Sequence, residues 1–147
     1  MKSDQLEKSL CFPLYAAAKE VIRQYAPLLE STGLTYTQYI TMTALWEYPD
    51  TAFDVGDLGS MLCLDSGTLT PLLKRLESKG YIVREAFRGD RRHTLVRCTD
   101  EGLRLKDALS AVPERMQQCC KLDARDAGEL CRLLHLLLDN LNNQNKE

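Results

Sequence analysis

The chain has 147 residues, of which 44% are apolar and 27% charged, and its formal net charge is −2. This composition is typical of a globular domain and excludes a disordered chain. No apolar run is long enough to cross a membrane, and the first residues, MKSDQLEKS, lack the apolar centre of a signal peptide. We therefore expect one cytoplasmic domain, residues 1–147, without membrane association.

The cysteines and histidines argue against a metal site. The six cysteines should be mostly reduced in the cytoplasm. No two of them have CxxC spacing, and the two histidines, His93 and His135, lie far apart in the sequence. We therefore expect neither a structural zinc ion nor a cofactor.

Two helices are predicted in the first third of the chain. Apolar residues recur at helical spacing over about residues 10–30. A second helix begins after Thr35, because Thr35 and Gln38 have the spacing of a capping box, and it ends before Pro49. Its expected buried face carries Tyr39, Met42, Leu45 and Trp46.

Two shorter helices follow. Asp54 begins the third helix, and Asp65 or Ser66 caps the fourth, which Gly80 ends. The expected core side of the fourth helix consists of leucines, namely Leu69, Leu72, Leu73 and Leu76. This spacing leaves the polar residues of the fourth helix on its solvent side.

The pattern then changes to strands. Residues 81–86 and 94–98 have strand propensity, and the polar stretch FRGDRRH between them is typical of a hairpin loop. Two further helices are expected. Thr99 caps the first, which is kinked or broken at Pro113, and the second covers about residues 123–142 with a wide leucine stripe.

Short helices followed by a two-stranded hairpin give the order of a winged helix-turn-helix, a mainly α fold of the α+β type. The long helices at both ends carry apolar faces that a chain of this length can hardly cover alone. We therefore expect them to interleave in a twofold homodimer. In this scheme residues 35–99 form the winged lobe that binds DNA, and residues 1–34 and 100–147 form the helical dimerisation lobe.

One segment is basic although the whole chain is weakly acidic. Residues 74–97 contain eight lysines and arginines against three acidic residues, a net charge of +5. A localised anion-binding surface fits this distribution. On charge alone, a merely solvated charged stretch fits it equally well.

The start of the fourth helix favours nucleic acid. Hydroxyls and backbone N–H groups at a helix start suit phosphates and base edges, because the helix dipole also attracts an anion there. The alternative is that these hydroxyls only cap the helix or face solvent. Arginines in the hairpin loop favour the first interpretation, since they can reach an adjacent narrow minor groove, and we expect Asp90 to hold this loop by pairing with Arg92. The residues expected to contact double-stranded DNA are Ser66, Thr68, Thr70, Pro71, Lys74, Arg75, Asp90, Arg91 and Arg92.

Three stretches strongly resemble the MarR family of winged-helix regulators: TYTQYITMTALWE, LDSGTLTPLLKRLESKGYIVRE and GDRRHTLVRCTDEG. The phrase LDSGTLTPLLKRLE together with LCFPLY resembles in particular the organic hydroperoxide resistance regulators and their thiol-sensing relatives. The resemblance covers about residues 6–140. It implies a homodimeric repressor, not an enzyme, that binds a palindromic operator and releases it when an organic hydroperoxide oxidises a cysteine.

The same resemblance implies a sensor site. In that family the reactive cysteine lies in the first helix beside two tyrosines, and Cys11, Tyr15 and Tyr25 match these positions. Pro13 removes an N–H group, so the helix begins near residues 10–12 or is kinked there. A start at that point would place Cys11 near the positive end of the helix dipole, which favours a thiolate.

The other cysteines have different expected roles. Some members of the branch form a disulfide with a second cysteine of the other subunit, and others react with a small thiol. By this resemblance Cys119 or Cys120 is the candidate resolving cysteine. We expect Cys63, Cys98 and Cys131 to be small buried residues.

Two other functions fit part of the sequence. One is a MarR-type repressor that a small aromatic or phenolic ligand releases, with inert cysteines; its fold and DNA contacts would be the same. The other is a thiol peroxidase, which works on an α/β fold that this sequence does not predict.

Overall fold

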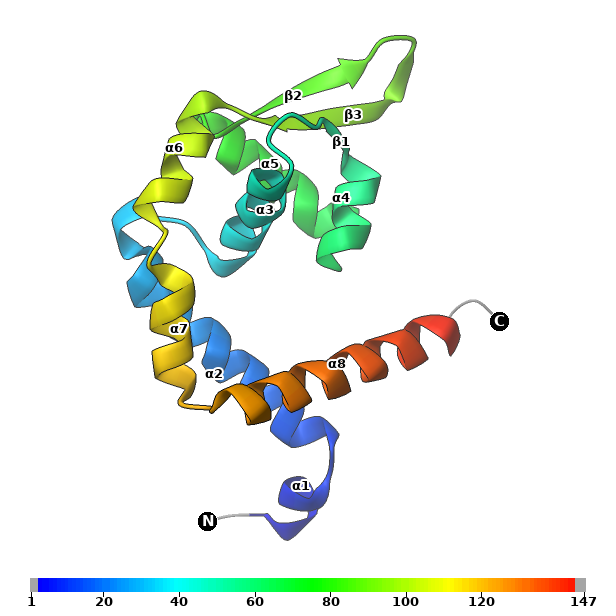
Figure 1. Ribbon diagram of the computed structural model, residues 1–147. Coiled ribbons are helices and arrows are strands. Elements are labelled where there is room, and N and C mark those ends of the chain that lie inside the picture. The colour runs from blue at the N-terminus through cyan, green and yellow to red at the C-terminus, as the bar shows by residue number, and fades with distance from the viewer. Residues whose placement is uncertain (1–2, 145–147) are drawn as a thin grey trace. The chain divides into compact units, whose positions relative to one another are not determined.

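The computed structural model describes residues 3–144, without the side chains of Arg91 and Gln144. The chain divides into two compact units, Met1–Pro113 and Glu114–Glu147. The first unit contains α1 (Asp4–Lys8), α2 (Cys11–Leu29), the 3-10 turn η1 (Glu30–Thr32), α3 (Tyr36–Glu47), α4 (Val55–Leu62), α5 (Ser66–Ser78) and α6 (Asp100–Ala108) (Figure 1). Helix α7 (Val112–Cys120) begins in the first unit and continues into the second, which also contains α8 (Ala124–Gln144).

A small antiparallel sheet completes the first unit. Its strands are β1 (Phe53–Asp54), β2 (Ile82–Phe87) and β3 (Asp90–Cys98), in the order β1-β3-β2. Strands β2 and β3 form the hairpin in Figure 1, and helices α3, α4 and α5 precede it in the chain. The order of helices, hairpin and flanking long helices confirms the predicted mainly α winged helix-turn-helix.

The sheet differs from the predicted two-stranded hairpin in two respects. Strand β1 adds a third strand, with Phe53 opposite Val96, and its two residues are too few to produce an alternating pattern. Strand β3 begins at Asp90 rather than at residue 94, so the turn is only Arg88–Gly89. Gly89 has a φ of 101°, a conformation that favours glycine in such a tight turn.

Helix caps explain where the helices of the first unit begin. The side chains of Thr35, Asp54, Asp65 and Thr99 each accept a hydrogen bond from a backbone N–H in the first turn of α3, α4, α5 and α6. At α3 the reciprocal bond from the Thr35 N–H to Gln38 completes the capping box. The predicted caps are confirmed, with Asp65 rather than Ser66 at α5.

The core of the first unit lies between α3, α5 and the sheet. Helix α3 and helix α5 contribute the apolar faces that their spacing predicts, and Trp46 Nε1 donates a hydrogen bond to the Gly102 carbonyl of α6 at 2.8 Å. The apolar residues with at most 1% exposure in α3, α4, α5 and the sheet are Met42, Leu45, Leu58, Leu69, Leu73, Leu76, Ile82 and Val96. Helix α5 thus packs against α3 and against strand β2 of the hairpin.

The predicted helix from Thr99 to Pro113 is interrupted. Helix α6 ends at Ala108 and α7 starts at Val112, so Pro113 lies in the first turn of α7. A first turn tolerates proline because its N–H groups need no helical partner. The break is thus confirmed and falls just before the proline.

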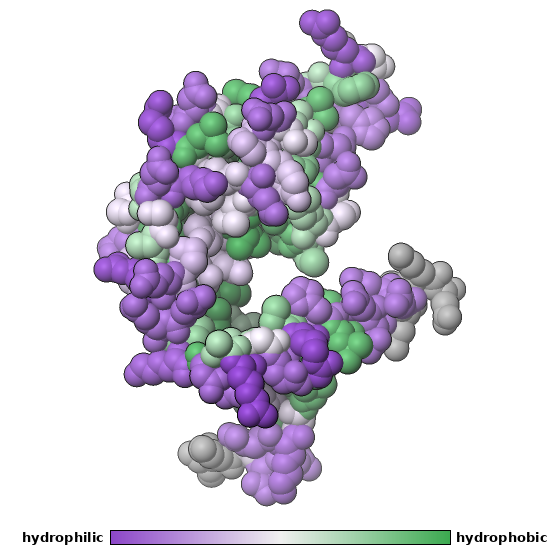
Figure 2. Space-filling model, in the orientation of Figure 1, coloured by the Kyte–Doolittle hydropathy of each residue, from purple (hydrophilic) through white to green (hydrophobic). Residues whose placement is uncertain are grey.

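The second unit leaves much apolar surface open. Leucines of α8 remain 45–49% exposed, and green surface is visible over α8 in Figure 2. These residues are Leu130, Leu133, Leu136, Leu138 and Leu141. No helix in the described part of the chain has the length and apolarity that a membrane span requires.

Candidate DNA interface and cysteine site

Helix α5 presents a polar face opposite its buried leucines. Asp65 Oδ1 accepts the Thr68 N–H at 2.8 Å and so fixes the first turn of the helix. Most of the residues predicted to contact DNA are exposed here: Ser66, Thr68, Pro71, Lys74 and Arg75. The exception is Thr70, which is half-buried and lines a pocket together with the buried Leu69 and Leu73.

The hairpin of β2 and β3, which we call the wing, carries two exposed arginines at its end, Arg88 and Arg92. Asp90 Oδ1 accepts the backbone N–H of Arg92 at 2.9 Å. Asp90 therefore shapes the turn as predicted, but through the backbone and not through the Arg92 guanidinium. Arg91 belongs to β3, and its side chain lies outside what the structure describes.

The positive charge of Arg84 is paired within the fold. Its Nε and Nη2 donate to the two carboxylate oxygens of Glu77, each at 3.1 Å, and its backbone N–H donates to the same carboxylate. The Arg84 contact lowers the pKa of Glu77. This pair ties α5 to β2, so part of the positive charge of residues 74–97 is neutralised within the fold.

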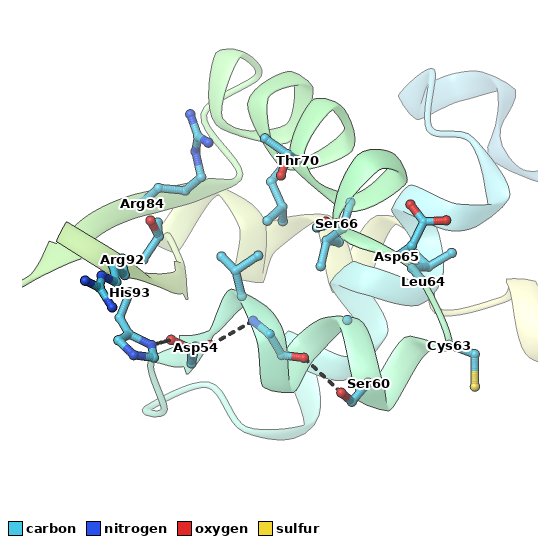
Figure 3. A pocket seen from close by; sticks show the side chains of 16 residues that line it. Asp54, Ser60, Cys63, Leu64, Asp65, Ser66, Thr70, Arg84, Arg92 and His93 are labelled. Atoms are coloured by element: carbon cyan, nitrogen blue, oxygen red, sulfur yellow. Dashed lines mark hydrogen bonds and ion pairs between the residues drawn. The ribbon is translucent and has the colours of Figure 1, made fainter. Parts of the chain in front are cut away.

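A second contact ties the wing to α4. His93 Nδ1 lies 2.7 Å from Asp54 Oδ2, while Asp54 Oδ1 accepts the Gly56 N–H at 2.8 Å (Figure 3). The contact with Asp54 raises the pKa of His93, and the same contact lowers the pKa of Asp54. We did not predict this pair, because His93 and Asp54 come together only through the unpredicted pairing of β1 with β3.

An open pocket lies between α4, α5 and the wing. Figure 3 shows Ser60 of α4 on one side and Thr70 of α5 on the other, with Arg84, Arg92 and His93 coming from the wing and the His93 ring lying beside Asp54. Side chains from the predicted DNA-contacting helix and from the wing thus border one hollow.

Cys11 is the first residue of α2. Its N-terminal cap is Leu10, and Ser9 Oγ accepts the Phe12 N–H at 3.3 Å. Pro13 therefore lies in the first turn, and the predicted start of the helix at residues 10–12 is confirmed. Cys11 is exposed, and so is Tyr15, which lies one turn further along the helix.

Tyr25 does not join this pair within one chain. It lies fourteen positions beyond Cys11 in α2, about 21 Å along a helix that rises about 1.5 Å per residue. Its ring instead contacts two tyrosines of α3, with centroid distances of 4.7 Å to Tyr36 and 5.6 Å to Tyr39. The matched sensor residues are therefore split between the two ends of α2.

Comparison with known proteins decides the family. Residues 34–94 match the model of the MarR family. Over 141 residues the chain is 39% identical to the organic hydroperoxide resistance transcriptional regulator of Bacillus subtilis (strain 168), a match that covers 96% of this chain and 95% of that protein. The chain belongs to the MarR family. It is a DNA-binding winged-helix transcriptional regulator, and its relatives are regulators rather than enzymes.

Other MarR-type regulators resemble it over almost the whole length. The regulator SarZ of Staphylococcus aureus (strain MRSA252) is 34% identical over 148 residues, which cover 100% of this chain and 99% of SarZ. AbfR of Staphylococcus epidermidis has been solved in its reduced form bound to DNA, with a TM-score of 0.75, 31% identity, and coverage of 93% of this chain and 94% of that one. The disulfide form of AbfR gives a TM-score of 0.60 and 29% identity, covering 97% and 94%.

The remaining cysteines of this MarR-family chain differ in exposure. Cys98 is buried as predicted, and burial raises the pKa of its thiol. The prediction was wrong for Cys63, which is exposed because it ends α4 with a φ of 54° and leaves the helix there. It was also wrong for Cys131, which is exposed on α8 with its Sγ 3.5 Å from His135 Nδ1.

The candidate resolving cysteines lie in the second unit. Cys119 and Cys120 are the last residues of α7, and both are exposed. Lys121, with a φ of 52°, ends the helix directly after them. Within residues 3–144, no group of three or more histidine, cysteine, aspartate or glutamate side chains suits a metal ion.

Proposed function

We propose that this MarR-family regulator is a homodimeric repressor that releases a palindromic operator when an organic hydroperoxide oxidises Cys11. The supporting observation is an exposed thiol at the first position of a long helix, with the Tyr15 phenol one turn away. The thiolate form of a cysteine is the form that attacks a peroxide rapidly, and an exposed thiol is accessible to the peroxide. The 39% identity to an organic hydroperoxide resistance regulator supports the same trigger.

The oxidation has a simple balance. The Cys11 thiolate attacks one oxygen of the hydroperoxide, the O–O bond breaks, and the alkoxide leaves and takes up a proton to become an alcohol. Cys11 is then a sulfenic acid. A second thiolate displaces its hydroxyl group as water and forms a disulfide.

We assign the second thiolate to Cys119 or Cys120 of the other subunit. Adjacent cysteines rarely bond to each other because the ring is strained, so a disulfide to Cys11 is the more favourable product for either of them. AbfR, which has been solved in a disulfide form, provides a related precedent. Single Cys119→Ser and Cys120→Ser variants, compared by non-reducing mass spectrometry after oxidation, identify the bonded cysteine.

The dimer is supported by the apolar surface that one chain leaves open. Besides the α8 leucines, α2 exposes Phe12, Leu14, Val21 and Ile22 by 37–46%. Exposed apolar helix faces of this kind mark association surfaces. With two copies related by a twofold axis, two α5 helices would enter major grooves about one helical turn apart, with the wings in the flanking minor grooves.

The trigger is tested by operator binding. Reduced protein should bind, a stoichiometric amount of cumene hydroperoxide should release the DNA, and dithiothreitol should restore binding. Cys11→Ser should bind equally well and lose the response completely. Cys63→Ser is the matched control, because it removes another exposed thiol from the first unit and should respond normally.

Release that persists in Cys11→Ser would contradict this function. The regulator released by a small aromatic or phenolic ligand would then be the better account. That alternative predicts release without any oxidant, reversed by dilution of the ligand and not by dithiothreitol.

A further inference from the structure

His93 connects three parts of the winged head, the name we give to α3, α4, α5 and the sheet, through its two ring nitrogens. Nδ1 lies 2.7 Å from Asp54 Oδ2, and Nε2 lies 3.8 Å from Asp90 Oδ2. Asp54 belongs to β1 and caps the first turn of α4 at the Gly56 N–H. Asp90 shapes the wing turn by accepting the N–H of Arg92. His93 therefore lies between the residue that orders the wing turn and the residue that starts α4.

The geometry suits the charged form of the ring. A neutral imidazole carries one N–H and directs a lone pair from its other nitrogen, whereas the imidazolium has an N–H on both. Carboxylates face both nitrogens of His93, so the neutral ring must turn a lone pair toward one of them. The charged groups around the ring are Asp54 from β1, Asp57 from α4, Asp90 from β3 itself and Arg92 on the rim of the same pocket.

We propose that His93 is a positioning residue for DNA binding, whose protonated ring holds the wing arginines in place relative to α4 and α5. The inference rests on the proposed contact between the wing and DNA. Deprotonation of His93 would loosen the wing, and operator affinity would fall.

The direction of the pH dependence follows from the Asp54 contact, which raises the pKa of His93 above its ordinary value of 6.5. A raised pKa means that the folded state stabilises the proton. The contact of the protonated His93 ring with Asp54 stabilises the folded state fully below pH 6.5. This stabilisation is lost as the pH rises through the higher pKa of His93 in the folded state. Operator affinity should therefore be highest on the acidic side and decline toward alkaline pH.

The first measurement is operator affinity by fluorescence anisotropy at fixed salt, between about pH 6 and about pH 8.5. The DNA is a duplex that the protein itself selects from a random-sequence pool, and a Cys11→Ser background keeps the proposed redox response out of the measurement. We expect the affinity to fall about two- to fivefold across this range, in keeping with an exposed ion pair. His93→Gln should remove this pH dependence, and His135→Gln, which changes the chain's other histidine, should retain it.

Asp54→Asn separates positioning from a direct contact between the imidazolium and a phosphate. Asparagine caps helices as well as aspartate does, so the variant keeps the start of α4 and loses only the charge. If His93 acts by position, Asp54→Asn weakens operator binding at acidic pH and flattens the profile. If the ring binds phosphate directly, removal of the neighbouring anion strengthens binding, and the proposal is overturned.

Two further measurements keep this proposal distinct from the proposed function. An NMR titration of His93 in the DNA-free protein should give a pKa above 6.5 that decreases in Asp54→Asn; an unchanged value contradicts the contact. If Arg92→Ala weakens binding but His93→Gln leaves the pH profile unaltered, the proposed role of His93 is overturned and the placement of the wing on DNA is retained. Unchanged binding by Arg92→Ala would overturn the placement of the wing on DNA, and the role of His93 with it.

Discussion

The winged head and the start of α2 differ in how much of their surroundings one chain supplies. In the head, Asp65 caps α5, Glu77 holds Arg84, and His93 contacts Asp54, so side chains of the same chain fix the surface proposed for DNA. At the start of α2, Cys11 is exposed, and Tyr25 lies about four turns away along the same helix. Packing within one chain thus orders the surface proposed for DNA, whereas we propose that a second chain completes the sensor.

Gly102→Ala has the largest expected effect on the winged head, because Gly102 of α6 packs against Tyr81, Cys98 and Met42. A Cβ at this buried position would collide with the Tyr81 carbonyl and lie 2.8 Å from Cys98 Sγ, and backbone cannot move aside as a flexible side chain can. We expect the free energy of unfolding to decrease by about 3 kcal/mol or more. Chemical denaturation followed by circular dichroism measures the change.

Gly128→Ala is the matched control for that substitution. Gly128 lies in α8, and no described atom lies within 4 Å of a Cβ added there. Alanine should stabilise the helix by about 0.5–1 kcal/mol. Equal stability of the two variants would show that the head is packed less tightly than the contacts of Gly102 indicate.

Arg92→Ala sharpens the contrast between the two regions, because it should weaken DNA binding without changing the redox response. Loss of one phosphate contact per wing should weaken operator binding about five- to tenfold and lower the salt dependence by about one counterion per wing. Binding isotherms over a series of salt concentrations measure both quantities. Arg104→Ala removes an exposed arginine that pairs with Glu101 on α6, and it should leave the salt dependence unchanged.

The features that the sequence predicted correctly are local ones. A cap such as Thr35 with Gln38 lies within four residues of the turn that it stabilises, and the leucines of α5 repeat at helical spacing, so both are visible in one stretch of sequence. The predicted DNA-contacting residues of α5 and the wing were identified by the same local logic. Their contacts with DNA remain a prediction.

The features that were missed depend on long-range or unusual geometry. The contact between His93 and Asp54 joins positions 39 residues apart and requires a strand of two residues. The exposure of Cys63 depends on a left-handed residue at the end of α4, which apolar spacing does not reveal. Tyr25 is separated from Cys11 because α2 is long and carries the two residues near its opposite ends. Matching residues to a family pattern does not reveal this separation, because the match does not state which subunit each residue comes from.

Mixed dimers test most directly whether two subunits complete the sensor. In one dimer, the first chain carries Cys11→Ser and the second carries Tyr25→Phe. The remaining Cys11 then faces an intact Tyr25 only if that tyrosine comes from the other chain. In the matched control, a single chain carries both substitutions and its partner is unchanged.

The rate of Cys11 oxidation by cumene hydroperoxide, measured by acid quenching and mass spectrometry, distinguishes the two arrangements. We predict that Cys11 in the first dimer reacts at the rate of an unmodified site, and that Cys11 in the control dimer reacts more slowly. The reverse order would place Tyr25 and Cys11 of one chain in the same site. That result would contradict a sensor completed by the second subunit.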